Sequence, residues 1–263
     1  TVSFKVYGVY YADPEVASGG DGTSWATAMS VSNAIAAAAQ SGIGEVWIKS
    51  GTLSAPTIAI VNNANLTIRG GFAGTETTLA ERQLGALTVF DGKVGNTRTS
   101  SILLSVENAT GVNLVIERIK FCNAKSNGFV KTGGGSLTVL DCAIEANGRD
   151  VGTVYGRGMN AQSDGSGSLV VSNCVFAGNR CVAGDKQYGG FGLYAKSFKS
   201  ALVDNSLFVT NGYNLTDQPG KTYAGFLYAR GSALYAENTP ITVRGCRFAG
   251  NNCPIRKRGN ERC

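Results

Sequence analysis

Residues 137–147 read LTVLDCAIEAN, and the same pattern returns as LVVSNCVFAGN at 169–179, ALVDNSLFVTN at 201–211 and ITVRGCRFAGN at 241–251. A fifth copy with fewer identities, LVIERIKFCNA, occupies 114–124. Apolar and polar residues alternate within each copy, which is the pattern of a half-buried β-strand rather than of a helix. The repeat therefore predicts stacked strands, because self-similarity along a chain is typical of solenoid folds.

Four positions of this repeat keep one kind of residue. The third is Val or Ile in every copy, the sixth is Cys in three copies, the eighth is Phe in four, and the eleventh is Asn in four. In a solenoid, equivalent residues of neighbouring coils lie about 4.8 Å apart, so identical side chains stack. We expect the Phe column to fill the interior. We expect the Asn column to form a hydrogen-bonded ladder at a corner, where Asn also tolerates a left-handed backbone.

Three shorter strand-like runs precede the repeat and begin at Val46, Leu66 and Leu87. One coil of a three-sided solenoid takes roughly twenty residues, and longer spacings indicate coils that carry insertions. Counting these runs with the five copies, we predict an all-β fold, a single-stranded parallel β-helix of about eight coils. Residues 1–45 would hold an N-terminal strand and a capping helix, 46–253 the β-helix, and 254–263 a basic tail.

A Gly-rich motif precedes the repeat in the longer coils. It reads GRGMNA at 156–161, GFGLYA at 190–195 and GSALYA at 231–236. The small residues permit a tight turn and a close approach of successive coils, and we expect the Leu or Met to point inward.

The two ends of the predicted solenoid differ. Residues 31–40 (VSNAIAAAAQ) predict a helix, capped by Ser30 or Ser32, that covers the N-terminal end. After 241–251 we find no second amphipathic cap, and uncovered strand edges template pairing. Head-to-tail docking of another subunit there would build a filament. The alternatives are that the tail folds over this end or that the native chain continues.

The Gly-rich motif followed by F-x-x-N resembles the repeats of the chlamydial polymorphic outer membrane proteins. F-x-x-N occurs at 176–179, 208–211 and 248–251, and I-x-x-N at 144–147 is similar. The stretches GDGTSWATA at 20–28, VWIKSGT at 46–52 and GGFAGTE at 70–76 resemble the opening of bacterial surface β-helix proteins of the Bacteroidetes and their relatives. The resemblance implies a right-handed parallel β-helix that is secreted or displayed on the cell surface, acting in adhesion or surface architecture.

The amino-acid composition excludes several kinds of catalytic and binding site. The 263 residues contain no His, which removes Ser-His-Asp triads, Cys-His dyads and most zinc sites. The net charge of +6 comes largely from the basic tail, so the body offers no nucleic-acid groove. No apolar run approaches the roughly 18 residues of a transmembrane span. Acidic residues are scattered rather than paired. We therefore expect no enzyme, no catalytic residue, no cofactor and no metal; the alternative is a polysaccharide lyase or glycosidase of the pectin-lyase-like fold.

Insertions follow the Asn corner in three consecutive coils, at 148–167, 180–199 and 212–239. Insertions stacked on one side of a solenoid form a continuous surface that often binds a partner. The expected partner is another protein subunit through self-association, or a glycan or protein of a cell surface. The candidate contact residues are Tyr188, Tyr194, Tyr213, Tyr223, Tyr228, Tyr235, Arg157 and Lys196. The alternative is that several of these tyrosines pack the loops onto the coils.

Seven cysteines are present, and four share the repeated motif C-x-F-A-G-N-x-C. Its spacing through a turn suggests two local disulfides, Cys174–Cys181 and Cys246–Cys253, which would imply an oxidising, extracellular location. Cys174 and Cys246 also share the phase of the inward Phe, so an inward stack, or a bridge from Cys142 to Cys174, is the alternative. Cys263 would be left over and could link to another subunit.

Overall fold

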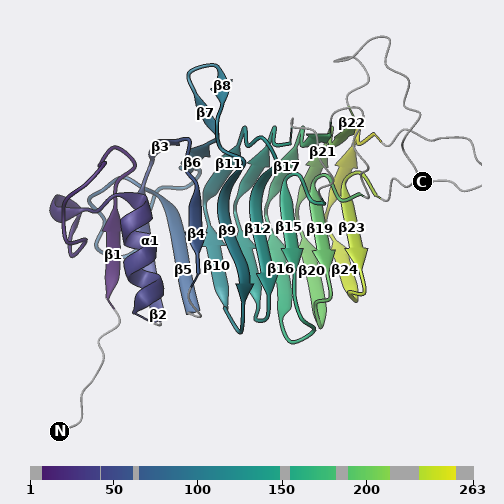
Figure 1. Ribbon diagram of the computed structural model, residues 1–263, viewed down its shortest axis with the longest axis horizontal. Helices are drawn as coiled ribbons and strands as arrows, with labels where there is room; N and C mark the ends of the chain where they lie inside the picture. Colours follow the sequence, from purple (N-terminus) through teal and green to yellow (C-terminus); the bar gives the residue numbers. More distant parts are fainter. Residues whose placement is uncertain are drawn as a thin grey trace, which may run out of the picture.

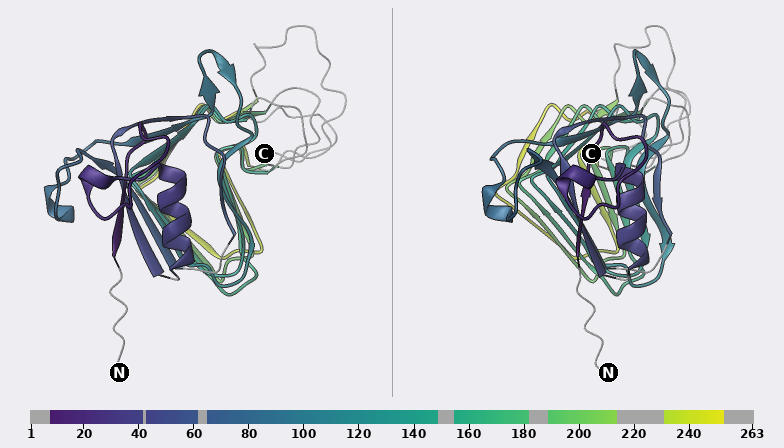
Figure 2. Two further views of the ribbon diagram at one scale, coloured as in Figure 1. Left: turned by 60° about the vertical axis from the view of Figure 1, so that its left-hand side comes forward. Right: turned by 90° about the vertical axis from the view of Figure 1, so that its left-hand side faces the viewer.

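The structure is a computed structural model that describes residues 8–41, 43–61, 65–148, 155–181, 189–213 and 231–252. Its strands form three long parallel sheets of eight, seven and six strands, named sheets A, B and C. Figure 2 shows the sheets as three sides around a shared interior, and Figure 1 shows them running side by side along the molecule. The chain is therefore mostly β and has the long parallel sheets that the predicted all-β solenoid requires.

Each sheet collects strands that are far apart in the sequence. Sheet A runs in the order β1 (Val9–Ala12), β2 (Ile43–Lys49), β5 (Asn65–Phe72), β10 (Leu114–Glu117), β13 (Leu137–Leu140), β16 (Ser168–Ser172), β20 (Ser200–Asp204) and β24 (Ile241–Arg244). Sheet B runs β3 (Gly51–Ser54), β6 (Thr88–Asp91), β11 (Ile119–Cys122), β14 (Ala143–Glu145), β17 (Val175–Ala177), β21 (Leu207–Val209) and β25 (Arg247–Ala249). Sheet C runs β4 (Ile58–Ile60), β9 (Ile102–Ala109), β12 (Asn127–Gly133), β15 (Met159–Gln162), β19 (Leu193–Lys196) and β23 (Leu234–Glu237).

Two small sheets and three helices complete the described elements. The pairs are β7 (Lys93–Val94) with β8 (Thr97–Arg98), and β18 (Arg180–Cys181) with β22 (Gly212–Tyr213). The helices are α1 (Val31–Gln40) and two short 3₁₀ turns, η1 (Trp25–Thr27) and η2 (Leu79–Glu81).

The register confirms the predicted interior columns. Val139, Val171, Val203 and Val243 are direct partners along sheet A. Along sheet B the rings of Phe176, Phe208 and Phe248 stack with centroids 4.6 and 4.9 Å apart and nearly parallel planes. All but the last members of these columns are buried, and they belong to one continuous hydrophobic core. The core therefore runs along the molecule between the three sheets.

Each copy of the repeat turns a corner at its fifth position, which the alternation did not reveal. The residues there have positive φ, as at Asp141 (51°), Asn173 (54°) and Asn205 (46°), so the first half of each copy lies in sheet A and the second half in sheet B. The strand-like run that begins at Leu87 does not lie in sheet A, unlike the runs that begin at Val46 and Leu66. It forms β6, in which Phe90 pairs with Phe121 in sheet B.

The predicted Asn ladder is present and fully buried over three rungs. Asn147 donates its backbone N–H and its Nδ2 to Oδ1 of Asn179, at 3.2 and 3.1 Å. Asn179 does the same to Asn211, at 3.2 and 2.9 Å. The left-handed residue is the one before each Asn, such as Gly178 (φ 59°), and not the Asn itself. Each Asn side chain thus forms hydrogen bonds with backbone groups at the corner, where the chain leaves the sheet.

The Gly-rich motif has the predicted steric role. Gly158 stands at the start of β15, where its N–H donates to the carbonyl of Phe191 at 2.7 Å. A Cβ at this position would lie 2.5 Å from the carbonyl oxygen of Gly192 and 2.9 Å from Nδ2 of Asn179. Met159 and Leu193 point into the core, as expected.

Helix α1 covers the N-terminal end of the core with the predicted boundaries. The Ser30 hydroxyl caps it by accepting the N–H of Asn33 at 3.4 Å. Five helix residues are buried in the core, namely Val31, Ala34, Ile35, Ala38 and Ala39. Figure 2 shows the helix lying across this end of the sheets.

Candidate functional site

The structure describes the side chains of four of the eight predicted contact residues, Arg157, Tyr194, Lys196 and Tyr235, and the backbone of a fifth. Tyr194 and Tyr235 are direct partners in β19 and β23, with rings stacked at 5.5 Å, and Tyr155 stacks on Tyr194 at 4.3 Å. The backbone of Tyr213 lies in β22. Tyr188, Tyr223 and Tyr228 lie outside the described residues.

The described candidate residues form hydrogen bonds or ion pairs within the chain. The Tyr194 hydroxyl donates to Oε2 of Glu237 at 2.8 Å, and Lys196 pairs with the same carboxylate at 3.0 Å. Burial, reinforced by the Glu237 carboxylate, raises the pKa of Tyr194, so its hydroxyl stays protonated. Arg157 is buried, and its Nη1 lies 3.5 Å from Oγ of Ser126. Tyr194, Tyr235 and Lys196 are thus brought together on the outer side of sheet C, with Tyr194 and Arg157 buried.

The described part of the chain gives no support to the predicted local disulfides. Cys174 and Cys246 both carry free thiols, so neither is joined to Cys181 or Cys253. The side chain of Cys181 and the whole of Cys253 lie outside the described part of the chain. The sixth position of the repeat follows the corner with its side chain directed toward the core, as in the alternative inward stack, so Cys174 is buried.

Hydrogen bonding explains why this column holds cysteine and serine. Cys142 donates its thiol to the carbonyl of Leu140 at 3.1 Å, and Cys174 donates to Ser172 at 3.2 Å. Ser206 occupies the same slot in the next coil, where its hydroxyl donates to Asp204 at 2.8 Å and accepts the N–H of Cys174 at 3.1 Å. The column is therefore a ladder of small polar donors at the corner, for which a thiol serves like a hydroxyl.

One buried lysine was not singled out by the sequence. Lys131 in β12 is fully buried, and its Nζ donates to the carbonyls of Gly133 and Gly134, each at 2.8 Å. Burial lowers the pKa of this amine to about 8, an effect that the nearby Asp164 opposes. The signal in the sequence was a single Lys within NGFVKTG, an otherwise uncharged strand.

The C-terminal end of the sheets exposes two residues whose counterparts are buried in the preceding copies of the repeat. Val243 and Phe248 are 41% and 47% exposed, whereas Val203 and Phe208, their partners one coil earlier, are 0% exposed. Among the described residues, β24, β25 and β23 are the last strands of their sheets and no helix lies over them (Figure 1). The sequence predicted no helical cap after 241–251, but it did not single out these two side chains, because 241–251 has the same pattern as the buried copies.

Charged groups border this exposed end. Arg247 begins β25 and Glu237 ends β23, both on the outer side of their sheets. Arg244, at the end of β24, pairs with Asp204 of the preceding coil at 2.9 Å. The candidate site is therefore an apolar surface of Val243 and Phe248, bordered by Arg247 and Glu237, which we call the C-terminal face.

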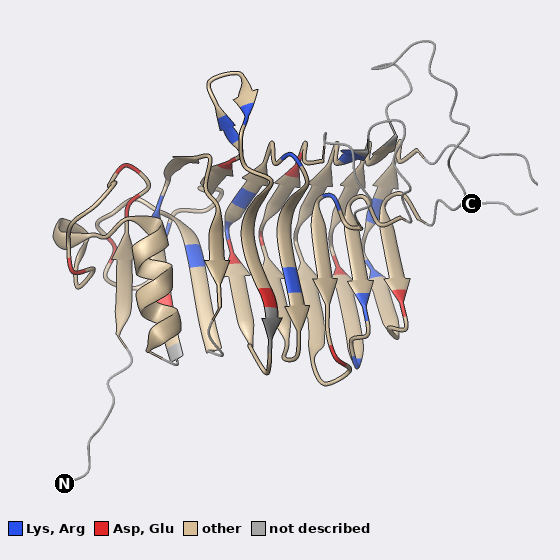
Figure 3. Ribbon diagram, viewed as in Figure 1, with Lys and Arg blue, Asp and Glu red and all other residues tan. Residues whose placement is uncertain are grey.

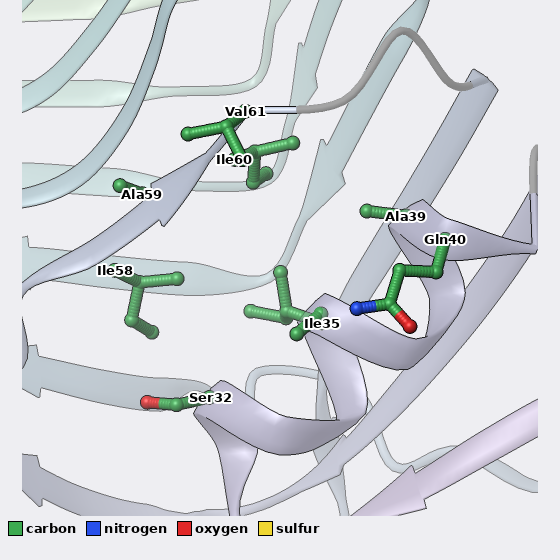
Figure 4. Close-up of a pocket in the computed structure, with 9 residues that line it drawn as sticks. Ser32, Ile35, Ala39, Gln40, Ile58, Ala59, Ile60 and Val61 are labelled. Atoms are coloured by element: carbon green, nitrogen blue, oxygen red, sulfur yellow. The ribbon is translucent and has the colours of Figure 1, made fainter.

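A cavity at the opposite end is too small for an organic ligand. It measures about 90 Å³ and lies between α1 and β4, with Ile35 on the helix side and Ile58 and Ile60 on the strand side (Figure 4). Binding pockets for small molecules usually enclose roughly 300–1,000 Å³. The cavity is a packing gap beside the capping helix.

Elsewhere the described surface shows no concentration of one charge. Basic and acidic positions are interspersed along the molecule (Figure 3), and several are paired, including Lys120 with Glu145 at 2.5 Å. No three acidic or cysteine side chains in the described part converge as a metal ion would require. None of its helices has the length and apolar character needed to cross a membrane.

Comparison with protein-family models, with curated proteins and with solved structures finds no match to this chain.

Proposed function

We propose that this chain is an extracellular or cell-surface structural subunit, a right-handed parallel β-helix of about eight coils that associates with other copies through its C-terminal face. The observation that carries the proposal is the exposure of Val243 and Phe248. Their partners Val203 and Phe208 are completely buried by the coil that follows. A further layer of strands on the C-terminal face would bury Val243 and Phe248 in the same way.

The energetics favour occupation of this face. Among the described strands, β23, β24 and β25 are the outermost of their sheets, and exposed strand edges template pairing. Burying apolar surface contributes about 25 cal/mol per Å². The ring of Phe248 already stacks on Phe208 on one side and has its other side available. Edge pairing and apolar burial therefore act at the same place.

The acidic residues support a non-enzymatic role. A lyase or glycosidase needs carboxylates that are available to a substrate. Glu145, Asp204 and Glu237 are each engaged by a cation of the same chain, namely Lys120, Arg244 and Lys196. These groups act in the structure as parts of ion pairs between neighbouring coils.

Sedimentation velocity over a wide range of concentration tests the proposal. We expect the wild-type chain to associate, and Val243→Asp and Phe248→Asp to abolish association, because each places a charge in the apolar surface. Matched controls are Val61→Asp and Leu84→Asp, at residues 78% and 90% exposed but away from the C-terminal face. Thermal unfolding followed by circular dichroism verifies that the variants are folded. A chain that stays monomeric at all concentrations, or one that associates equally well in all variants, overturns the proposal.

A further inference from the structure

At the N-terminal end, the first described strand of sheet A is already paired on its outer edge. The outer edge of β1 is occupied by residues 22–29: the Tyr11 N–H donates to Gly22 at 2.9 Å, its carbonyl accepts from Met29 at 2.9 Å, and the Asp13 N–H donates to Met29 at 3.0 Å. Helix α1 covers the apolar opening beside this edge. Among the described residues, the C-terminal face is therefore the end that offers exposed core side chains to a second copy.

We propose that two copies pair through their C-terminal faces about a two-fold axis, so that the chain forms a closed dimer rather than a head-to-tail filament. The inference rests on the proposed self-association and specifies its geometry. When both partners use the same surface, the contact is isologous, and an isologous contact closes at two subunits. Blocked edges at both outer ends of such a dimer would prevent further growth.

The arrangement of the three sheets fixes which strands meet. An axis through the middle of sheet A and the opposite corner places β24 against β24 of the second copy, antiparallel. It exchanges sheets B and C, so β25 faces β23 of the second copy. With Thr242 at the centre, Ile241 lies opposite Val243 of the other copy, and both point into the interior, as their register in sheet A requires. The apolar core then continues from one copy into the other.

The charges on the C-terminal face fit this pairing. Because β25 and the facing β23 run antiparallel, the start of one meets the end of the other. Arg247, at the start of β25, therefore faces Glu237, at the end of β23, and both belong to the outer side of their sheets. Within its own chain the Glu237 carboxylate also contacts Lys196 and Tyr194, so Arg247 of the second copy would join an existing ion pair. The two-fold axis produces this pair of opposite charges twice. Opposite charges across an interface favour association and fix its register.

Charge-reversal variants of Arg247 and Glu237, made in separate chains and then mixed, test the two-fold geometry. We expect Arg247→Glu alone and Glu237→Lys alone each to weaken the dimer by about tenfold or more, since each places two pairs of like charges across the interface. Mixing the two single variants should restore a heterodimer, because every charge pair is then opposite again. The double variant should associate with itself. Native mass spectrometry, with one chain isotopically labelled, distinguishes these species.

Lys93→Glu, in the β7–β8 hairpin away from this face, has the same change of charge as Arg247→Glu and should leave the dimer intact. If the wild type associates but the mixed variants do not pair, the two-fold geometry is wrong and self-association stands. Oligomers that grow beyond two subunits also overturn the dimer. A monomeric wild-type chain overturns both this inference and the proposed function.

Discussion

Asn211 donates both its backbone N–H and its side-chain Nδ2 to Oδ1 of Asn251, each at 3.0 Å, across 40 residues of sequence. The same two hydrogen bonds join Asn179 to Asn211. Each Asn also donates Nδ2 to a carbonyl of the preceding coil, as Asn251 does to Phe208 at 2.8 Å. One side chain therefore ties three successive coils together at the corner.

Replacing a central rung should cost more than replacing the last one. Asn179→Ala removes a buried acceptor and leaves backbone groups of Asn147 and Ile144 without their partners. Each buried group left unsatisfied costs about 1–3 kcal/mol, so we expect a loss of about 2–4 kcal/mol in the free energy of unfolding. Asn251→Ala should lower the free energy of unfolding by less, because Asn251 is partly exposed. Urea unfolding measures both, and equal losses would contradict the ladder as a source of stability.

Gly158 should not tolerate a methyl group. Its φ is not in the left-handed region, so Gly158→Ala tests the approach of the Gly192 carbonyl alone. We expect a loss of more than about 1 kcal/mol, because overpacking in a dense interior costs about 1–3 kcal/mol. Gly8→Ala is the matched control, since no atom lies within 4 Å of an added Cβ there. Thermal melts of the two variants give the comparison, and indistinguishable melting temperatures would refute the steric role.

Lys131 makes stability depend on pH in the alkaline range. Its pKa in the folded chain, about 8, lies below the ordinary value of 10.5, so the unfolded chain binds more protons between these values. The free energy of unfolding should therefore rise with pH across this window. Relative to Lys131→Met, the wild type should gain about 1–3 kcal/mol from pH 8 to pH 10.5.

Chemical unfolding of the wild type, Lys131→Met and Lys196→Met at several pH values isolates this contribution. Lys196 is a partly exposed lysine, so its removal should leave the alkaline slope close to that of the wild type. If the slope is unchanged in Lys131→Met, the buried amine does not titrate as described.

The buried cysteines should resist alkylation until the chain unfolds. Burial raises the pKa of Cys122 to about 11 and raises that of Cys142, so few thiolates exist near neutral pH. In a variant with Cys181, Cys253 and Cys263 changed to Ser, we expect Cys122, Cys142 and Cys174 to react far more slowly than the partly exposed Cys246. Intact-mass analysis with iodoacetamide, with and without urea, measures this. Rapid labelling of Cys174 in the native chain would contradict its position.

Serine should replace cysteine in this column with little effect. Ser206 already fills the equivalent slot and makes the equivalent bond to a carbonyl two residues earlier. Cys174→Ser should therefore change the free energy of unfolding by less than about 1 kcal/mol, as one ordinary hydrogen bond does. Urea unfolding checks this value, and a much larger loss would show that the thiol contributes more than a donor.

Sequence periodicity predicted the stacked columns, because the apolar or polar character of each residue indicates whether its side chain faces the core or the solvent. The alternation of Val and Phe placed both columns in the core, and the Asn spacing predicted the ladder. Helix α1 was also predictable to the residue, because Ser30 and the Ala-rich run are local signals. The corner at the fifth position was not predicted, since a positive φ at Asp141 leaves the apolar alternation of the two halves unchanged.

The sequence by itself determined that this chain stacks strands around a single core, because each copy of the repeat carries its own pattern of burial. Only the tertiary structure decided that Cys174 holds a hydrogen bond instead of a disulfide, that β6 belongs to sheet B, and that Val243 and Phe248 are left exposed. The physical reason is that burial depends on the neighbouring coil. An identical pattern of residues is core when another coil covers it and surface when none does.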